Sequence, residues 1–291
     1  ARGGHVVKTE RNPHSVEDYS ELKSVRKSKI FAWVPIMQGC NKFCTYCIVP
    51  YVRGREISRT IDDISNEIQT LADEGYKEVT LLGQNVNSYG LDFRNGTDFG
   101  DLIRAIDKID DIERVRYMTS HPRDMTFEMI DAMAESSKVV RHMHLPVQHG
   151  SNEMLKKMNR GYTIEHFKEL LSYVRSKMPD IVVTTDLITG FPGETEEMHQ
   201  ETLALLKEVR FDSAYSPRTG TPAARMEDQI DSDTKHRRLQ ELMDVENEIS
   251  LELNKEMEGK TYSIIVEGPS KQDPMNWYGR TSGNKMILFP Y

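Results

Sequence analysis

The chain has 291 residues, of which 37% are hydrophobic and 29% are charged, and its formal net charge is −8. This length suits one large α/β domain with appendages, and the composition is that of a globular protein. No apolar run approaches the roughly 20 residues that a membrane helix needs, and the net charge does not indicate a nucleic-acid binder. We therefore predict a soluble, cytoplasmic, monomeric protein with no membrane partner.

Strand-like segments alternate with amphipathic helical segments along most of the chain. Residues 1–29 are polar without a sustained period and are predicted to form a linker or arm. A helix is predicted between its cap Thr60 and Gly75, because the apolar residues in between recur on one helical face. The further helices are predicted at 99–109, 127–135, 153–158, 164–177 and 196–209. The strands are predicted at 30–36, 79–82, 115–119, 142–147, 181–188 and 211–215.

This alternation predicts a parallel sheet with right-handed crossovers. Six such units favour a partial (β/α)6 barrel over residues 30–222, and a doubly wound open sheet is the alternative. A long charged helix at 232–257, within a 223–258 segment, is predicted to pack back on the barrel. Strands at 262–266 and 286–289 predict a small C-terminal β unit over residues 259–291.

All the cysteines lie in one short loop, Gly39-Cys40-Asn-Lys-Phe-Cys44-Thr-Tyr-Cys47, directly after the first predicted strand. Three clustered thiols do not form a disulfide scaffold, so secretion is disfavoured. In a parallel barrel this loop lies at the C-terminal face, where such folds carry their chemistry. Thiolates suit iron–sulfur clusters, and three of them leave one iron of a [4Fe–4S] cluster open to a chelator such as S-adenosylmethionine (SAM). Zinc held with a distant histidine, or unligated buried thiols, are the alternatives.

The sequence around this loop resembles the radical SAM methylthiotransferase family. Matching segments run in order from about residue 30 to residue 290. They include Met37-Gln-Gly-Cys40, Cys47-Ile-Val-Pro-Tyr-Val-Arg-Gly-Arg-Glu56, Ser120-His-Pro122, Leu145-Pro-Val-Gln148, Met158-Asn-Arg160-Gly-Tyr-Thr163, Gly190-Phe-Pro-Gly-Glu-Thr195 and Arg218-Thr-Gly-Thr-Pro222. Within that family, Leu81-Leu-Gly-Gln-Asn-Val-Asn-Ser-Tyr89 is similar to members that act on prenylated adenosine in tRNA.

The resemblance implies a reaction at an N6-isopentenyladenosine beside the anticodon of tRNA. A radical formed from SAM would remove hydrogen from C2 of this base, where a methylthio group is then installed. The implied partners are the anticodon stem-loop of tRNA and a one-electron reductant. A sister enzyme acting on threonylcarbamoyl-adenosine or on a ribosomal protein stays open, and so does a non-catalytic RNA-binding protein with structural zinc. Family members hold a second, auxiliary [4Fe–4S] cluster on three further cysteines, so we expect that cluster on residues outside this sequence.

The resemblance also implies a set of SAM-binding residues, each of which could instead stabilise a loop. Tyr46 matches the residue whose backbone meets the adenine, and Gly83 lets the backbone approach the ligand closely. The fork of Arg160 suits a carboxylate. The full set is Tyr46, Gly83, Gln84, Asn85, Ser120, Gln148, Arg160, Asp186, Phe191 and Pro192.

Two groups of residues are predicted to contact RNA. Val266-Glu-Gly-Pro-Ser-Lys271 and Gly279-Arg-Thr-Ser-Gly-Asn-Lys285 resemble an abbreviated TRAM domain, a small β-barrel that binds RNA through basic and aromatic groups. In this tail those groups are Lys271, Trp277, Tyr278, Arg280 and Lys285. Just beyond the cysteine loop, Arg53 and Arg55 are predicted to contact phosphates of the anticodon stem.

Overall fold

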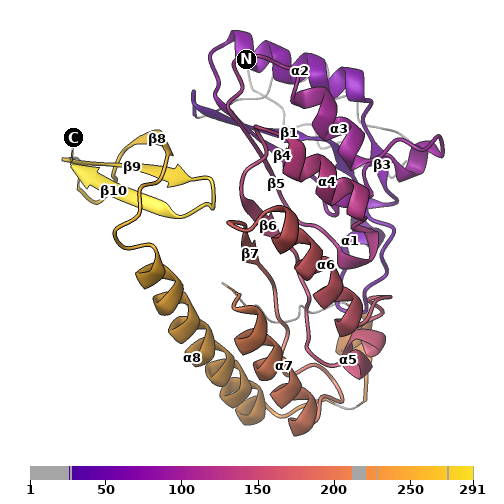
Figure 1. Ribbon diagram of the computed structural model, residues 1–291. Helices are drawn as coiled ribbons and strands as arrows, with labels where there is room; N and C mark the ends of the chain where they lie inside the picture. Colours follow the sequence, from indigo (N-terminus) through magenta and orange to yellow (C-terminus); the bar gives the residue numbers. More distant parts are fainter. Residues whose placement is uncertain (1–25, 27, 212–220, 228, 274, 291) are drawn as a thin grey trace, which may run out of the picture.

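The computed structural model describes residues 26, 28–211, 221–227, 229–273 and 275–290. Figure 1 shows a curved layer of strands covered by helices, with a long helix leading to a separate small sheet at the C-terminus. The predicted arm at 1–29 falls almost entirely outside the described residues. The predicted strand at 211–215 does so as well, apart from Phe211.

The central strands run parallel, as the sequence predicts. Strands β1 (Phe31–Pro35), β4 (Glu78–Leu82) and β5 (Arg114–Tyr117) are hydrogen-bonded in the order β1-β4-β5. Strands β6 (His142–His144) and β7 (Val182–Thr184) form a second parallel pair. A bridge between Val115 of β5 and Val139, which precedes β6, links the two groups. These five parallel strands therefore follow one another around a single curved wall.

Helices cover the outer face of this wall, and short polar caps start them. The side chains of Thr60, Asp98, Thr126, Thr163 and Thr195 each accept a hydrogen bond from the third backbone amide of their helix, which satisfies an otherwise unpaired donor. The helices on the barrel are α1 (Val49–Arg53), α2 (Ile61–Asp73), α3 (Phe99–Ile106), α4 (Phe127–Glu135), α5 (Asn152–Lys157), α6 (Ile164–Lys177) and α7 (Glu196–Val209). The 3-10 helices are η2 (Val86–Ser88), η3 (Leu91–Phe93), η4 (Pro122–Asp124) and η5 (Pro222–Arg225).

Several predicted elements are too long. The helix predicted at 99–109 ends at Ile106, and Ile109 is buried from the following turn instead. The strand predicted at 142–147 ends at His144, because Pro146 has no amide to donate to the ladder. The strand predicted at 181–188 ends at Thr184, since the Thr185 hydroxyl replaces the backbone there. It accepts from the Val147 amide and donates to the Leu145 carbonyl, at 2.8 and 2.9 Å.

The C-terminal part consists of one long helix and one antiparallel sheet. Helix α8 (Ser232–Glu256) packs along α7 and buries Leu242 and Ile249. The sheet has the order β10-β9-β8, with β8 at Ile264–Pro269, β9 at Asn276–Thr281 and β10 at Met286–Pro290. The central strand β9 was not predicted, because its polar residues and Gly279 hide the alternation of a strand.

The small sheet docks on the barrel through backbone oxygens. The Arg114 guanidinium donates to the carbonyls of Arg280 and Ser263, and that of Arg116 donates to the Thr281 carbonyl at 2.9 Å. These contacts join the sheet to the β5 end opposite the cysteine loop. None of the described helices is long and apolar enough to cross a membrane.

Candidate active site

The three-cysteine loop follows β1 and lies between two two-residue strands, β2 (Met37–Gln38) and β3 (Ile57–Ser58), which pair with each other. Cys40 and Cys44 are buried, Cys47 is half-buried, and none of the three forms a disulfide. Distant backbone groups hold the loop. The Thr45 amide donates to the Met158 carbonyl at 3.1 Å, and the Ala223 amide donates to the Thr45 carbonyl at 2.8 Å. The backbone of the loop is thus held by two segments, at Met158 and at Ala223, that lie far from it in the sequence.

Gly39, which precedes the first thiol, has a left-handed backbone with φ of 73°. A Cβ atom built there would lie 1.9 Å from the Arg55 carbonyl oxygen, so no side chain fits. We expect Gly39→Ala to displace Cys40 and to lower iron incorporation severely. Gly54→Ala is the matched control, because Gly54 has a similar φ of 74° but no atom within 4 Å of its Cβ position. Equal iron content in the two variants would contradict this reading.

Burial favours the protonated form of the Cys40 thiol. It is the largest of the causes that together raise the pKa of Cys40 to about 11; the charges of Glu56, Cys44 and Cys47 act in the same direction, and a hydrogen bond from the Lys42 amide acts against them. A metal must therefore displace a proton from Cys40 at neutral pH. As the side chains lie, no three His, Cys, Asp or Glu groups in the described residues form a metal-binding set.

Arg160 is the cation beside the thiols. Its side chain is buried, and Nη1 lies 3.4 Å from Cys44 Sγ and 3.1 Å from the Tyr46 hydroxyl. Nη2 donates to the Pro146 carbonyl at 2.8 Å. Sequence reasoning predicted a carboxylate partner for Arg160. In the structure this guanidinium contacts the Cys44 thiol, where a buried positive charge would offset thiolate charge. Its contact with a carboxylate stays a prediction.

Three predicted SAM-binding residues carry buried oxygen atoms with no hydrogen-bond partner in the described part of the chain. These atoms are Gln84 Oε1 and Asn85 Oδ1, which follow β4, and Ser120 Oγ, which follows β5. Buried polar atoms without a partner are rare in folded proteins and cost about 1–3 kcal/mol each. Their position at neighbouring strand ends, on the side of the cysteine loop, fits a polar ligand such as the amino-acid part of SAM.

The remaining predicted residues lie at the same strand ends or beneath the loop. Gln148 has a left-handed φ of 73°, and its backbone amide donates to the backbone carbonyl of Asp186 at 2.9 Å. Asp186 lies 3.4 Å from His144 Nε2. Phe191 is fully buried among Met154, Met158, Ile188 and Ala223, and Tyr46 packs against this group. Gly83 lies against Met37 and Val86, and Pro192 is buried.

Sequence reasoning missed two buried ion pairs near the loop. Lys42 Nζ lies 2.7 Å from Asp124 Oδ1, and Asp124 Oδ2 accepts from the Asn85 amide at 2.6 Å. Glu194 accepts from His149 and Arg238 at 2.9 and 2.8 Å. The partners are 39 to 82 residues apart in the sequence, so no local pattern marks them.

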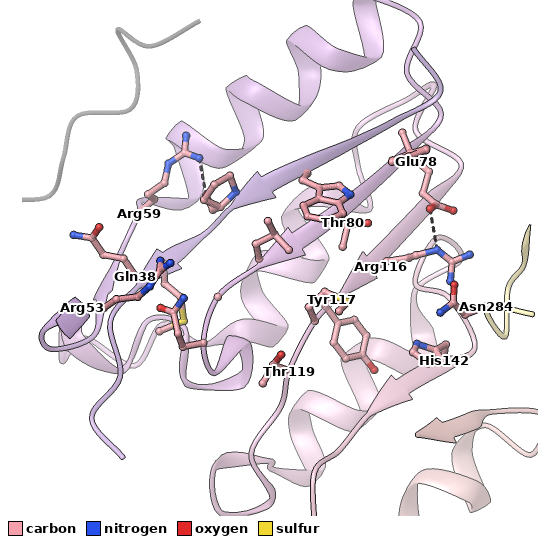
Figure 2. Close-up of a pocket in the computed structure, with 18 of the residues that line it drawn as sticks. Gln38, Arg53, Arg59, Glu78, Thr80, Arg116, Tyr117, Thr119, His142 and Asn284 are labelled. Atoms are coloured by element: carbon pink, nitrogen blue, oxygen red, sulfur yellow. Dashed lines mark hydrogen bonds and ion pairs between the residues drawn. The ribbon is translucent and has the colours of Figure 1, made fainter. Parts of the chain in front are cut away.

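A cavity of about 700 Å³ lies along the inner face of the barrel (Figure 2). Its wall comes from β1, β4 and β5, and Gly83, Gln84 and Arg53 line the end near the cysteine loop. Its opposite end is charged. There Arg116 pairs with Glu78 at 2.8 Å, and Arg280 of the C-terminal sheet pairs with Glu267 at 3.1 Å.

The predicted RNA contacts are spread over several surfaces. Arg53 is exposed at the end of α1 beside the cavity, and the Arg55 guanidinium lies over the Phe43 ring at 4.9 Å. Lys271 is exposed between β8 and β9, and the Lys285 amide donates to Thr281 Oγ1. Arg280 faces the cavity and Glu267 rather than the outer surface of the sheet. All five assignments stay predictions.

A partial parallel barrel with a C-x3-C-x2-C loop after its first strand defines the class of radical SAM enzymes. Residues 34–206 match the family model of the radical SAM superfamily, and residues 255–291 match that of the TRAM domain. The chain belongs to the radical SAM superfamily. The predicted cofactors, a [4Fe–4S] cluster and SAM, are confirmed by this membership. Which residues hold them stays a prediction.

Curated relatives of the chain carry a more specific enzyme name than the superfamily. The chain is 56% identical to a tRNA-2-methylthio-N(6)-dimethylallyladenosine synthase from Carboxydothermus hydrogenoformans, over 91% of this chain and 61% of that protein. It is also 56% identical to the protein of the same name from Desulforamulus reducens, over 91% and 59%. The chain thus spans about three fifths of the length of these relatives.

Solved structures confirm the fold. Coproporphyrinogen III oxidase (HemN) from Escherichia coli superposes with a TM-score of 0.58 at 15% identity, over 90% of this chain and 71% of that one. The radical SAM methyltransferase TsrM from Kitasatospora setae gives 0.55 at 18% identity, over 68% and 38%. The partial barrel is therefore confirmed over the doubly wound alternative. The domain limits at 29, 222 and 258 stay predictions.

Proposed function

We propose that the chain carries the catalytic centre of a tRNA methylthiotransferase. Its substrate would be an N6-dimethylallyladenosine beside the anticodon, and its product the 2-methylthio derivative. The observation that carries the proposal is the arrangement of one barrel: the three-cysteine loop and three unpartnered buried oxygens lie at one end. A sheet of the RNA-binding TRAM type docks at the other. Relatives at 53–56% identity bear the corresponding name.

The chain's own residues would hold and orient the cofactors. Cys40, Cys44 and Cys47 would bind the [4Fe–4S] cluster, and the buried Arg160 would balance thiolate charge beside Cys44. When bound and reduced, the cluster supplies the electron that cleaves SAM and makes its 5′-deoxyadenosyl group able to take a hydrogen atom. The polar end of SAM would form hydrogen bonds with the side chains of Gln84, Asn85 and Ser120.

Installing a methylthio group also needs a sulfur source. The three thiols of this sequence are assigned to the first cluster, so we propose a second [4Fe–4S] cluster on residues outside it. A one-electron reductant is a further proposed partner. The cytoplasmic location and the monomeric state stay predictions.

Isotope transfer tests the proposed function. The reconstituted protein is mixed with SAM, reductant and an anticodon stem-loop that carries deuterium at C2 of the dimethylallyladenosine. We expect 5′-deoxyadenosine that contains deuterium, measured by mass spectrometry. A parallel stem-loop with threonylcarbamoyl-adenosine should give none. Unlabelled 5′-deoxyadenosine alone, although the RNA is bound, would contradict the proposal.

The arginines beyond the cysteine loop provide a test of RNA binding. Arg53 and Arg55 are exposed near the cavity, where contacts to phosphates would position the stem-loop. We expect the double Arg→Ala variant to bind RNA more weakly and to lose about two phosphate contacts from the salt dependence of binding.

The matched control removes two cations elsewhere. Arg104 and Lys108 are exposed on the outer side of the barrel at α3, and replacing both by alanine should leave RNA binding unchanged. SAM cleavage without RNA should survive in both double variants. Identical salt slopes for the two variants would show that Arg53 and Arg55 do not contact RNA.

A further inference from the structure

The inner face of the barrel presents side chains in rows. In β1 the buried Ala32 and Val34 face the helices, whereas Phe31, Trp33 and Pro35 face the cavity. The strand register places Trp33 beside Thr80, and Thr80 beside Arg116. Pro35 lies beside Leu82 in the same way. Met118 comes directly after β5, and its backbone amide donates to the Leu81 carbonyl. The row nearer the cysteine loop is therefore apolar, and Trp33 lies one row deeper.

Trp33 is unusually exposed for a large apolar residue of a barrel strand. Its side chain is 62% exposed and Met118 is 45% exposed, although both line a cavity. An indole is a large apolar surface with a flat face, and it binds planar aromatic rings well. These two side chains and Pro35 therefore offer a flat, apolar contact surface inside the barrel.

The charged end of the cavity is already paired. Arg116 donates to Glu78 and to the Thr281 carbonyl, and Arg280 pairs with Glu267. Because these groups already pair with one another, we place the ligand against the apolar side chains of the wall. These are Trp33, which shares its row with Thr80 and Arg116, and the neighbouring row nearer the cysteine loop.

We propose that this wall receives the prenylated adenine of the RNA, with Trp33 against the base and the Pro35–Leu82–Met118 row against the dimethylallyl group. The inference rests on the proposed function and deepens it by naming the residues that select the substrate. Burial of a five-carbon apolar group against this row favours binding, because its surface is removed from water. The carboxylate of a threonylcarbamoyl group would lose its hydration against the same row, so the wall selects against that sister substrate.

The two tryptophans of this sequence make the proposal directly measurable. They are Trp33 and Trp277, so Trp277→Phe leaves Trp33 as the single reporter and Trp33→Phe leaves Trp277. Each protein is titrated with three stem-loops that carry dimethylallyl-, threonylcarbamoyl- or unmodified adenosine. Fluorescence anisotropy of labelled RNA gives the binding constant independently of tryptophan emission and of catalysis.

We expect the Trp33 emission to be quenched saturably by the dimethylallyl stem-loop, with a midpoint that matches the anisotropy. Stacking of a base on an aromatic ring contributes to RNA affinity, so Trp33→Ala should weaken binding of this RNA about tenfold. The preference over the unmodified RNA should shrink in Met118→Ala as well. Leu251→Ala, at an exposed site on α8, is the control and should change neither quantity. Because Trp33 is largely exposed, Trp33→Ala should keep the melting temperature, which is measured alongside.

Each contrary result has a distinct meaning. If the RNA binds but Trp33 emission stays constant, or if Trp33→Ala retains full affinity and preference, this inference is wrong. Deuterium transfer by the unaltered protein in that case would leave the proposed function standing. If none of the three RNAs binds, both the inference and the proposed function fail.

Discussion

Cys44→Ala is expected to abolish iron incorporation and all SAM cleavage. Three thiolates are needed to hold a four-iron cluster with one open site, and Cys44 is the thiol beside the buried Arg160 guanidinium. Removing it leaves two thiols and an uncompensated buried cation. After anaerobic reconstitution, iron and sulfide analysis, visible absorbance and 5′-deoxyadenosine release measure the loss.

Thr45→Val is the matched control for this variant. The Thr45 hydroxyl donates to the Lys157 carbonyl at 3.1 Å, so the variant loses one hydrogen bond, worth about 1 kcal/mol, but keeps all three thiols. Its iron content should stay near that of the unaltered protein. Iron at the unaltered level in Cys44→Ala would sink the assignment of the cluster to this loop.

Arg238→Ala is expected to have the largest effect on stability. The Glu194 side chain is fully buried, and Arg238, only 5% exposed, lies 2.8 Å from it. Burial alone would raise the pKa of Glu194, but hydrogen bonds from His149 and the Gly190 amide and the charge of Arg238 hold it below its ordinary value. Removing Arg238 breaks a buried ion pair and leaves the Glu194 charge buried, which costs about 3–5 kcal/mol. Urea unfolding monitored by circular dichroism measures this loss.

The pH dependence of that loss separates charge from packing. A carboxylate with a lowered pKa in the folded state stabilises above its unfolded pKa, and the contribution fades as the pH falls through the folded pKa. In Arg238→Ala the buried Glu194 can relieve its penalty by taking up a proton. The difference between the two proteins should therefore be smaller near about pH 5 than at neutral pH. A difference that is constant over this range would assign the effect to packing.

Arg237→Ala, at the neighbouring residue, is the control. Arg237 pairs with Glu196 and Glu241 on the surface, and its side chain is 47% exposed. Exposed ion pairs contribute about 0–1 kcal/mol, so the urea midpoint of this variant should be close to that of the unaltered protein. The contrast matters for function because Glu194 also accepts from the Gly190 amide at 2.6 Å. Arg238 thereby attaches α8 to the segment that carries Phe191 beneath Tyr46.

The sequence predicts the helices well because their signals are local. The predicted cap Thr60 is confirmed, and Thr126, Thr163 and Thr195 cap the helices that follow them in the same way. The strands are less predictable, because their ends depend on partners in other strands. Thr185 breaks the ladder only because the Leu145 and Val147 backbones lie beside it.

The same distinction applies to the site. The spacing of Cys40, Cys44 and Cys47 and the place of the loop after a strand are local features, and both could be predicted. The side-chain partners could not. Arg160 faces Cys44 across 116 residues of sequence, and Arg238 faces Glu194 across 44. Strand alternation places Trp33 on one face of β1, but only the assembled wall shows that this face lines a cavity.

The most direct test of the account is the nucleoside composition of tRNA from a strain that lacks the gene for this protein. We predict that 2-methylthio-N6-dimethylallyladenosine disappears and that its precursor without the methylthio group accumulates. The intact gene should restore the product, and the gene carrying Cys44→Ala should not. Unchanged levels of the methylthio nucleoside in the deletion strain, or restoration by the Cys44→Ala gene, would contradict the account.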